Sequence, residues 1–403
     1  MLYNGHIETK AMQLRPHQQR ALDALVKHVI GQVIFPTGAG KTNVAIFDAI
    51  REFLKETPQT IVVVAPRILL AEQLSCEFLE FITNANVFHV HSGETHHQSS
   101  TKPSDIRWFV EHSRSDGKHQ LIFTTYHSLK QLVTAGIDVN TIYFDEAHHS
   151  VKRNFFPNTE HFAANANRCY FFTATRKTSL TPSKPGMNDR EIYGDIICRV
   201  SAPELVDGGY IIAPKIIAKK FDVLAPRQVT AECDSSNLID TLEDIDCKKI
   251  LVCVKSAKQL INLMSHTDCA AQLHQRGYSY LYITSKTGAI IDGKKVNREV
   301  FFDTLNAWGK DPSKKFICLH RSILSEGMNV SELEAVVFLR NMDVIEMVQT
   351  VGRVLRKGGK DKVCGLCVVP VYSRVGIATE RALQGVVDAV FERGELLDSV
   401  VRR

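Results

Sequence analysis

The chain has 403 residues and a formal net charge of +5, with 49 Lys and Arg against 44 Asp and Glu. A chain of this length exceeds one ordinary hydrophobic core, so two domains are expected. The apolar fraction of 44% and the charged fraction of 23% are typical of globular proteins. No apolar run reaches the roughly 20 residues of a membrane-spanning helix, and the N-terminal stretch MLYNGHIETK lacks the layout of a signal peptide. The small positive charge permits a polyanionic partner without requiring one.

Apolar runs alternate with helix-period segments along the chain. In the first half the runs are GQVIF (31–35), TIVVVAP (60–66), QLIFTTY (120–126), TIYFDE (141–146) and RCYFFTAT (168–175). After a loop-rich stretch and a polar, acidic segment at 224–246, the runs resume as KKILVCV (248–254), YSYLYIT (278–284), KFICLH (315–320), AVVFLR (335–340) and GLCVVPV (365–371). This alternation predicts an α/β fold in which mostly parallel sheets are flanked by helices. We expect two lobes, 1–207 and 208–403, joined near residues 207–209, and one amphipathic C-terminal helix over 381–403.

The ten cysteines do not form the pattern of a disulfide scaffold in so long a chain. Cys253 and Cys318 lie in apolar runs and are predicted to be buried thiols. Cys364 and Cys367 form a C-x-x-C pair, but a zinc site needs further ligands, so a strand position is favoured. These features predict an intracellular, reducing setting. The histidine-rich stretch 88–97 could bind a metal ion, and a solvated loop is the preferred interpretation.

The stretch FPTGAGKT (35–42) fits the phosphate-binding pattern G-x-x-x-x-G-K-[ST] except that Phe35 replaces the first glycine. A predicted strand precedes the stretch and a helix follows it, so backbone N–H groups at the helix start would face phosphates. Lys41 would reach the β- and γ-phosphates, and the Thr42 hydroxyl would bind Mg²⁺. The alternative is an ordinary strand-to-helix turn with a surface lysine. The predicted nucleotide-binding residues here are Thr37, Gly38, Ala39, Gly40, Lys41 and Thr42.

An acidic pair at a strand end supplies the second part of such a site. Asp145 and Glu146 follow the apolar strand predicted at 141–144, about 100 residues after the loop. Asp145 can hold Mg²⁺, directly or through water, and Glu146 can polarise the attacking water. The loop and the acidic pair together favour a phosphate-cleaving nucleotide site with Mg²⁺ over the alternative of a simple turn.

With these residues the chain resembles a superfamily 2 helicase of the DEAH-box type, over nearly its whole length. In LRPHQ (14–18), Gln18 would read the adenine; DEAH (145–148) resembles motif II. The resemblance implies two RecA-like P-loop NTPase lobes with ATP between them. It further assigns nucleic-acid contacts to Arg67 and Thr125, and coupling between the ATP state and the nucleic acid to Thr173 and Thr175 of motif III.

The second lobe continues the resemblance in order. LVCVKSAKQL (251–260) is similar to motif IV, where Ser256 would contact a phosphate of the nucleic acid, and Ser256 could instead cap the following helix. SILSEGMNV (322–330) is similar to motif V, with Gly327 near the nucleotide, although Asn329 replaces the aspartate of many relatives. QTVGRVLR (349–356) is similar to motif VI. There the resemblance implies that Gln349 couples the ATP state to the nucleic acid and that Arg353 and Arg356 stabilise the transferring phosphoryl group. The alternative for the two arginines, which are three residues apart, is a basic face of a helix.

The form of motif VI is closest to the motor subunits of type I and type III restriction enzymes and to DNA-repair translocases, which favours DNA over RNA. The resemblance implies an ATP-dependent helicase or translocase that uses ATP and Mg²⁺. Two alternatives stay open: a motor subunit of a restriction, modification or repair complex, and an ATP-gated nucleic-acid clamp that does not move. The sequence is compatible with a monomer, with a subunit of a complex and with a protein partner that supplies specificity. We recognise in it no hairpin that could separate strands.

Overall fold

The computed structural model describes residues 13–93, 95–181, 183–221, 229–284, 286–321, 332–339, 350, 365–371, 381, 383–395 and 397–400. The chain divides into two compact units. The first comprises Met1–Pro36, Gly40–Val200 and Leu396–Arg403, and the second comprises Thr37–Ala39 and Ser201–Glu395. The division between Val200 and Ser201 lies just before helix α8 (Ala202–Asp207), whereas the joint expected near residues 207–209 lies at the end of this helix.

The first unit is built on a seven-stranded sheet in the order β3-β4-β2-β5-β6-β1-β8. All of its strand pairs are parallel. The central strands are buried throughout because helices cover both faces of the sheet. The strands are β1 (Ile30–Ile34), β2 (Thr60–Ala65), β3 (Ala85–Val90), β4 (His119–Thr125), β5 (Thr141–Phe144), β6 (Arg168–Thr173) and β8 (Ile196–Arg199).

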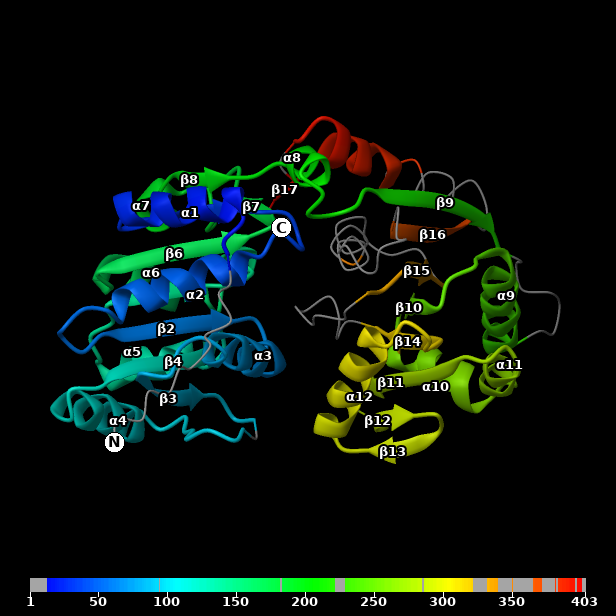
Figure 1. Ribbon diagram of the computed structural model, residues 1–403, viewed down its shortest axis with the longest axis horizontal. Coiled ribbons are helices and arrows are strands. Elements are labelled where there is room, and N and C mark those ends of the chain that lie inside the picture. Colours follow the sequence, from blue (N-terminus) through cyan, green and yellow to red (C-terminus); the bar gives the residue numbers. More distant parts are fainter. Residues whose placement is uncertain are drawn as a thin grey trace, which may run out of the picture. The chain divides into compact units, whose positions relative to one another are not determined.

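Helices of the first unit pack on the two faces of this sheet (Figure 1). One group comprises α1 (Pro16–Lys27), α2 (Lys41–Glu52) and α3 (Ile68–Leu79). In this group α2 contacts both α1 and α3, α3 also contacts β2 and β4, and α1 contacts β8. The second group shares an apolar core with the sheet and comprises α4 (Pro103–Ser115), α5 (Leu129–Ala135), α6 (Phe156–Asn165) and α7 (Arg190–Tyr193). A short 3₁₀ turn, η1 (Ala147–His149), follows β5.

The second unit contains an eight-stranded sheet in the order β13-β12-β11-β14-β10-β15-β16-β9. Its parallel part is formed by β9 (Pro214–Lys220), β10 (Lys249–Cys253), β11 (Ser279–Thr284), β14 (Phe316–His320), β15 (Ala335–Phe338) and β16 (Gly365–Val371). The antiparallel edge is the hairpin of β12 (Gly288–Ile291) and β13 (Lys294–Val296). Its helices are α8, α9 (Thr230–Asp244), α10 (Ala257–Ser265), α11 (Cys269–Gln275), α12 (Arg298–Lys310) and the π-helical turn η2 (Asp388–Glu392). The expectation of mostly parallel α/β sheets is confirmed in both units.

Three segments differ from the expectations. The hairpin β12–β13 was not recognised in the sequence, although its Asp292–Gly293 turn has φ angles of +44° and +78°, as a two-residue hairpin turn requires. The acidic segment at 224–246 contains the helix α9. The prediction of one helix over 381–403 is wrong, because β17 (Leu397–Val400) pairs in parallel with β7 (Thr175–Thr178) of the first unit. Gly394, at φ +65°, lies between the helical turn and β17, as is common where helices end.

Among the described residues, no helix combines the length and the apolar character needed to cross a membrane. The cysteines expected to be buried thiols are indeed buried and free, and they include Cys253 and Cys318. Cys367 is a buried thiol within β16, as the strand interpretation predicted. Cys364 lies outside the described residues.

Candidate nucleotide-binding site

The phosphate-binding loop connects β1 to α2, which begins at Lys41. Gly38 and Gly40 have φ angles of +88° and +79°, a region that glycine occupies without steric cost. Phe35, at the position of the missing glycine, is fully buried, and its ring meets the His17 ring edge-on at 5.7 Å. The phenylalanine therefore packs into the core. The first N–H groups of α2 have no partner within the helix, which suits them to phosphate oxygens.

Gln18 lies directly against this loop. Its Nε2 donates to the carbonyl of Gly40 at 3.4 Å, and its Oε1 accepts from the backbone N–H of Arg15 at 2.9 Å. A Cβ at Gly40 would lie only 2.2 Å from Gln18 Nε2, so the Gln18 amide would have to move, and it is the left-handed backbone with φ +79° that favours glycine there. Adenine recognition by Gln18 stays a prediction, and the structure adds a contact that holds α1 against the loop.

The acidic pair lies where β5 ends, next to β2 and β6 in the sheet. The N–H of Asp145 donates to the carbonyl of Val64 at 2.9 Å, which continues the strand pairing. Burial raises the pKa of the Asp145 carboxyl; the Glu146 charge acts in the same direction and Lys41 opposes it. Lys41 thus lies near enough to Asp145 to act on it electrostatically. The structure brings together the ammonium and the carboxylate that the sequence placed in one Mg²⁺–nucleotide site.

Glu146 adopts a left-handed conformation with φ +45°, which is uncommon for a residue other than glycine. Such a conformation costs on the order of 1–3 kcal/mol and is concentrated at functional sites. Glu146 Oε2 lies 3.5 Å from His148 Nδ1, and the same nitrogen lies 3.1 Å from the Thr173 hydroxyl. Burial lowers the pKa of His148, while the Glu146 charge raises it, so His148 is mainly neutral near pH 7.

Thr173 continues this chain of contacts. Its hydroxyl donates to the carbonyl of Thr175 at 2.7 Å and accepts from the N–H of Thr175 at 3.1 Å. A chain of polar contacts therefore runs from Glu146 through His148 to the turn between β6 and β7. The structure joins motifs II and III physically, although their coupling role is untested.

The predicted nucleic-acid contacts lie at strand and helix ends. Arg67 is exposed and directly precedes α3. Thr125 ends β4, is almost fully buried, and its hydroxyl lies 3.3 Å from the Ser128 hydroxyl and the Ser128 N–H. Ser256 caps α10 by accepting from the N–H of Gln259 at 3.0 Å. The capping alternative for Ser256 is thus observed, and phosphate contacts by these residues stay predictions.

Several predicted residues lie outside the described part of the chain. They are Gly327 of the motif V stretch and Gln349, Arg353 and Arg356 of the motif VI stretch. Their assigned roles rest on the resemblance alone.

The histidine-rich stretch 88–97 is only partly the solvated loop expected, because its first part is a buried strand end. His89 lies in β3 and is buried with His91, and their rings are joined by a contact of 2.9 Å between Nδ1 of His89 and Nε2 of His91. The other nitrogen of His89 lies 3.1 Å from the Ser75 hydroxyl. Burial lowers the pKa of His89 to about 3, and His91 and His97 act in the same direction. No group of three potential metal ligands occurs among the described residues.

This burial predicts a loss of stability in mild acid. The unfolded chain protonates His89 near pH 6.5, whereas the folded chain does so near pH 3, so stability is lost as the pH falls below about 6.5. Between pH 7.5 and pH 5.5, His89 should lower the free energy of unfolding by roughly 1 kcal/mol. Urea titrations of the wild type and of His89→Gln at both pH values measure the contribution of His89 to this change in the free energy of unfolding. An equal pH dependence in the two proteins would contradict it.

A buried charge network behind the site was not predicted. Asp48, on α2, accepts from the hydroxyl of Tyr143 at 2.6 Å and from Arg168 at 2.9 Å. Arg168 also lies 3.0 Å from Glu52 and donates to the Tyr170 hydroxyl at 2.9 Å. Burial alone would lower the pKa of Arg168, but its bonds to Asp48 outweigh burial and raise it. The network joins the helix that begins at the phosphate loop to β5 and β6. The only sequence signal was that charged residues occupy an otherwise apolar helix face.

Two α/β units, the first with a phosphate-binding loop beside an acidic strand end, have the fold of RecA-like P-loop NTPase lobes. Residues 11–178 match the family model "Type III restriction enzyme, res subunit". This match, over less than half of the chain, supports the resemblance drawn from its ordered motifs. No curated protein sequence matches the chain.

Solved structures with this fold include two restriction enzymes and one further protein. The Type ISP restriction-modification enzyme LlaBIII bound to DNA aligns with a TM-score of 0.72 at 16% identity, over 97% of this chain and 31% of its own. A nuclease-deletion mutant of the Type ISP enzyme LlaGI in complex with a DNA substrate mimic aligns with a TM-score of 0.66 at 18% identity, over 96% of this chain and 30% of its own. Mss116p bound to ssRNA and AMP-PNP aligns with a TM-score of 0.64 at 13% identity, over 97% of this chain and 75% of its own. The chain thus spans about a third of the two restriction enzymes, and these likenesses show its fold.

Proposed function

We propose that this chain is an ATP-dependent nucleic-acid translocase or helicase. The observation that carries the proposal is the electrostatic proximity of Lys41, which begins α2, to Asp145 and Glu146, which follow β5. This is the set of groups that phosphoryl transfer to water needs. The fold of two RecA-like lobes supports coupling that reaction to movement on a polymer.

The residues fit Mg²⁺ and a nucleoside triphosphate. The loop glycines leave the backbone N–H groups open at a helix start, and the Lys41 ammonium stands beside them. Thr42 and Asp145 would hold the metal ion, and Glu146 would accept the proton of the attacking water. When bound, Mg²⁺·ATP supplies a phosphoryl group whose transfer to water releases free energy for movement. Arg353 and Arg356 would stabilise the charge of that group from the second lobe.

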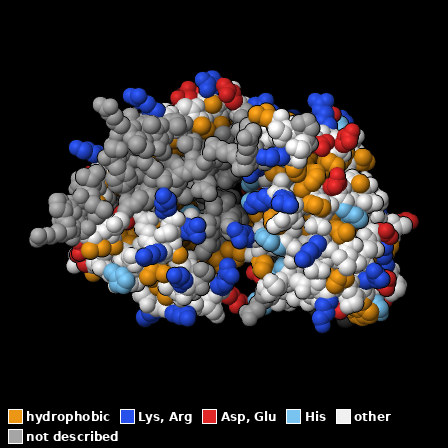
Figure 2. Space-filling view, turned by 180° about the vertical axis from the view of Figure 1, so that it is seen from behind, with side chains coloured by type: hydrophobic (Ala, Val, Ile, Leu, Met, Phe, Trp, Pro, Cys, Tyr) orange, Lys and Arg blue, Asp and Glu red, His pale blue; other side chains and the backbone are white. Residues whose placement is uncertain are grey.

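DNA is the proposed track. Two of the structurally similar proteins are bound to DNA or to a DNA substrate mimic, and the form of motif VI agrees. The third is bound to single-stranded RNA, so RNA is the rival. Four exposed basic residues surround the edge hairpin of the second unit, and none of them is in an ion pair within the described chain; they are Lys286, Lys294, Lys295 and Arg298. Figure 2 shows Lys and Arg side chains gathered at the lower left, on the unit that carries this hairpin. Such charges favour a polyanion.

A second candidate is a motor subunit that depends on a partner. The family model that matches residues 11–178 describes a restriction-enzyme subunit, and the chain spans only about a third of the two restriction enzymes with the same fold. A partner could then supply cleavage, modification or recognition of a target site. We place the protein in a reducing, intracellular setting, because the cysteines of the described chain are free thiols.

The deciding experiment is ATP hydrolysis with no polymer and with single-stranded DNA, duplex DNA, single-stranded RNA and duplex RNA. Lys41→Ala provides the blank. Strong stimulation by DNA is expected. Stimulation by RNA alone would overturn the choice of track, and equal rates in all tubes would favour the partner-dependent subunit. Displacement of a triplex-forming strand from duplex DNA would exclude a stationary clamp.

A further inference from the structure

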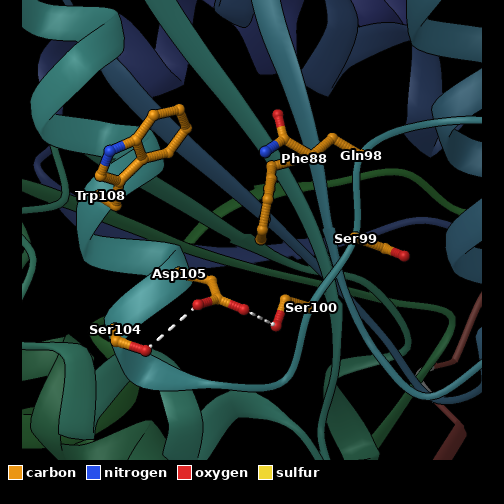
Figure 3. Close-up of a pocket in the computed structure, with 7 residues that line it drawn as sticks. All are labelled: Phe88, Gln98, Ser99, Ser100, Ser104, Asp105 and Trp108. Atoms are coloured by element: carbon orange, nitrogen blue, oxygen red, sulfur yellow. Dashed lines mark hydrogen bonds between the residues drawn. The ribbon is translucent and has the colours of Figure 1, made fainter.

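A cavity of about 340 Å³ opens at the edge strand β3 of the first unit. It lies between β3, the segment 98–100 and the first turns of α4. In the sheet, β4 and β2 separate β3 from β5, so the cavity is distinct from the nucleotide site. The residues that give it chemical character are Phe88, Ser100, Ser104, Asp105 and Trp108 (Figure 3).

The cavity presents one carboxylate that two hydroxyls hold in place. Asp105 Oδ2 accepts from the Ser100 hydroxyl at 2.7 Å, and its Oδ1 accepts from the Ser104 hydroxyl at 3.2 Å. The Ser100 hydrogen bond, with help from Ser104 and Lys102, lowers the pKa of Asp105, so the group is ionised at neutral pH. Each carboxylate oxygen still has a lone pair for an incoming donor.

An indole ring stands beside this carboxylate. Trp108 follows Asp105 by three residues on α4, which places both on one side of the helix. The ring is 52% exposed, a large value for tryptophan, yet it is held in place by His112, whose ring stacks on it at 4.0 Å between centroids. Phe88, almost fully buried, provides an apolar floor. Figure 3 shows the rings of Trp108 and Phe88 on the same side of the Asp105 carboxylate.

We propose that this cavity binds a cationic side chain, an arginine in preference to a lysine, presented by a partner protein. A guanidinium can stack on an indole face and donate to a carboxylate at the same time, whereas an ammonium is a strongly hydrated point charge. Most of the lining is exposed, so the cavity cannot enclose a free small molecule in the way cofactor sites do. A group carried by a larger surface fits such an open site, and an exposed tryptophan is the residue type that anchors interfaces.

A purine base is the main rival, because it could also stack on Trp108 and donate an amino group to Asp105. The charges around the cavity favour the cation. The Asp105 carboxylate is ionised and lines the cavity, so a nucleotide phosphate would be repelled. Lys102 is the nearby basic group that would oppose the cation. The inference concerns a partner contact and does not depend on the ATPase proposal.

The chain has only two tryptophans, which makes a direct test possible. In a Trp308→Phe background the fluorescence reports Trp108 alone. It is titrated at constant pH with N-acetyl-arginine amide and with N-acetyl-citrulline amide, the uncharged analogue of the same shape. Arginine amide should change the emission with millimolar affinity, citrulline amide should bind about three- to fivefold more weakly, and Asp105→Asn should remove this preference. Added salt should weaken only the arginine response.

Three results would overturn the proposal: equal responses to arginine and citrulline amides, an arginine response that Asp105→Asn leaves intact, or a response to GMP or AMP with none to arginine. ATP hydrolysis should be unchanged in Asp105→Asn, which confirms folding. If Trp308→Phe does not fold, ¹⁹F NMR of the wild-type chain labelled with 5-fluorotryptophan gives the same readout, since the Trp108 signal is assigned by its loss in Trp108→Phe.

Discussion

Replacing Glu146 by glutamine is expected to lower kcat for ATP hydrolysis by about 10²–10⁴-fold while ATP stays bound. Glutamine has the shape of glutamate but cannot take a proton from the attacking water. Glu146 directly follows Asp145 and acts on it electrostatically, and its Oε2 lies 3.5 Å from His148 Nδ1, so its carboxylate has a partner next to the predicted metal ligand. Steady-state hydrolysis gives kcat, and equilibrium titration with a fluorescent ATP analogue gives the affinity. The variant should also hold nucleic acid more tightly in the presence of ATP, because its ATP-bound state cannot turn over.

Lys41→Ala is the matched comparison. It removes the ammonium beside the phosphates, so turnover should be lost through weaker ATP binding, and nucleic acid should not be trapped. Near-normal turnover in Glu146→Gln would mean that Glu146 is not the base. Loss of ATP affinity in Glu146→Gln as large as that in Lys41→Ala would mean that Glu146 binds the nucleotide and does not activate water.

The strands of both sheets could be predicted because their signal is local. Runs such as TIVVVAP and KKILVCV contain few polar residues, as strands buried on both faces must, and they became β2 and β10. The phosphate loop and the acidic pair were equally accessible, since a short motif specifies each and parallel strands bring their carboxyl ends to one edge. Lys41 and Asp145 met as expected for this reason.

The strands that were not predicted from the sequence escaped prediction for a different physical reason. β17 forms by pairing with β7, more than two hundred residues earlier, and a window of sequence contains no sign of its partner. The hairpin β12–β13 did have a local sign in the Asp292–Gly293 turn, but its strands are short and two lysines occupy the second one. The edge position explains this composition, because an edge strand is not buried on both faces.

The buried network around Asp48 could not be read from the sequence because its members are distant along the chain. Asp48 and Arg168 are 120 positions apart and meet at 2.9 Å. Charged residues on a helix are usually solvated, so a prediction from the helix sequence alone places Asp48 and Glu52 on the surface. Only the packing of α2 on β5 and β6 makes Asp48 and Glu52 buried groups. Their partners therefore have to be found in the folded chain.

Removing Arg168 is expected to be the most destabilising single change in this part of the fold. Arg168→Met keeps the length of the side chain and leaves the Asp48 and Glu52 carboxylates buried with less compensation. Breaking a buried ion pair from one side costs about 3–5 kcal/mol, and urea denaturation should show a loss of this size. Lys55→Met is the control: it removes another partner of Glu52, at 2.6 Å, but from a side chain that is 50% exposed. Its cost should stay below about 1 kcal/mol.

A double-mutant cycle then separates the network from ordinary packing. If Asp48 and Arg168 stabilise each other, Asp48→Asn combined with Arg168→Met should cost clearly less than the sum of the single changes. Additive losses, or a loss in Arg168→Met no larger than in Lys55→Met, would show that the pair does not hold α2. Since α2 begins at Lys41, a helix loosened at Asp48 should also bind ATP more weakly. Arg168→Lys, which keeps the charge but not the forked donors, should fall between wild type and Arg168→Met in both measurements.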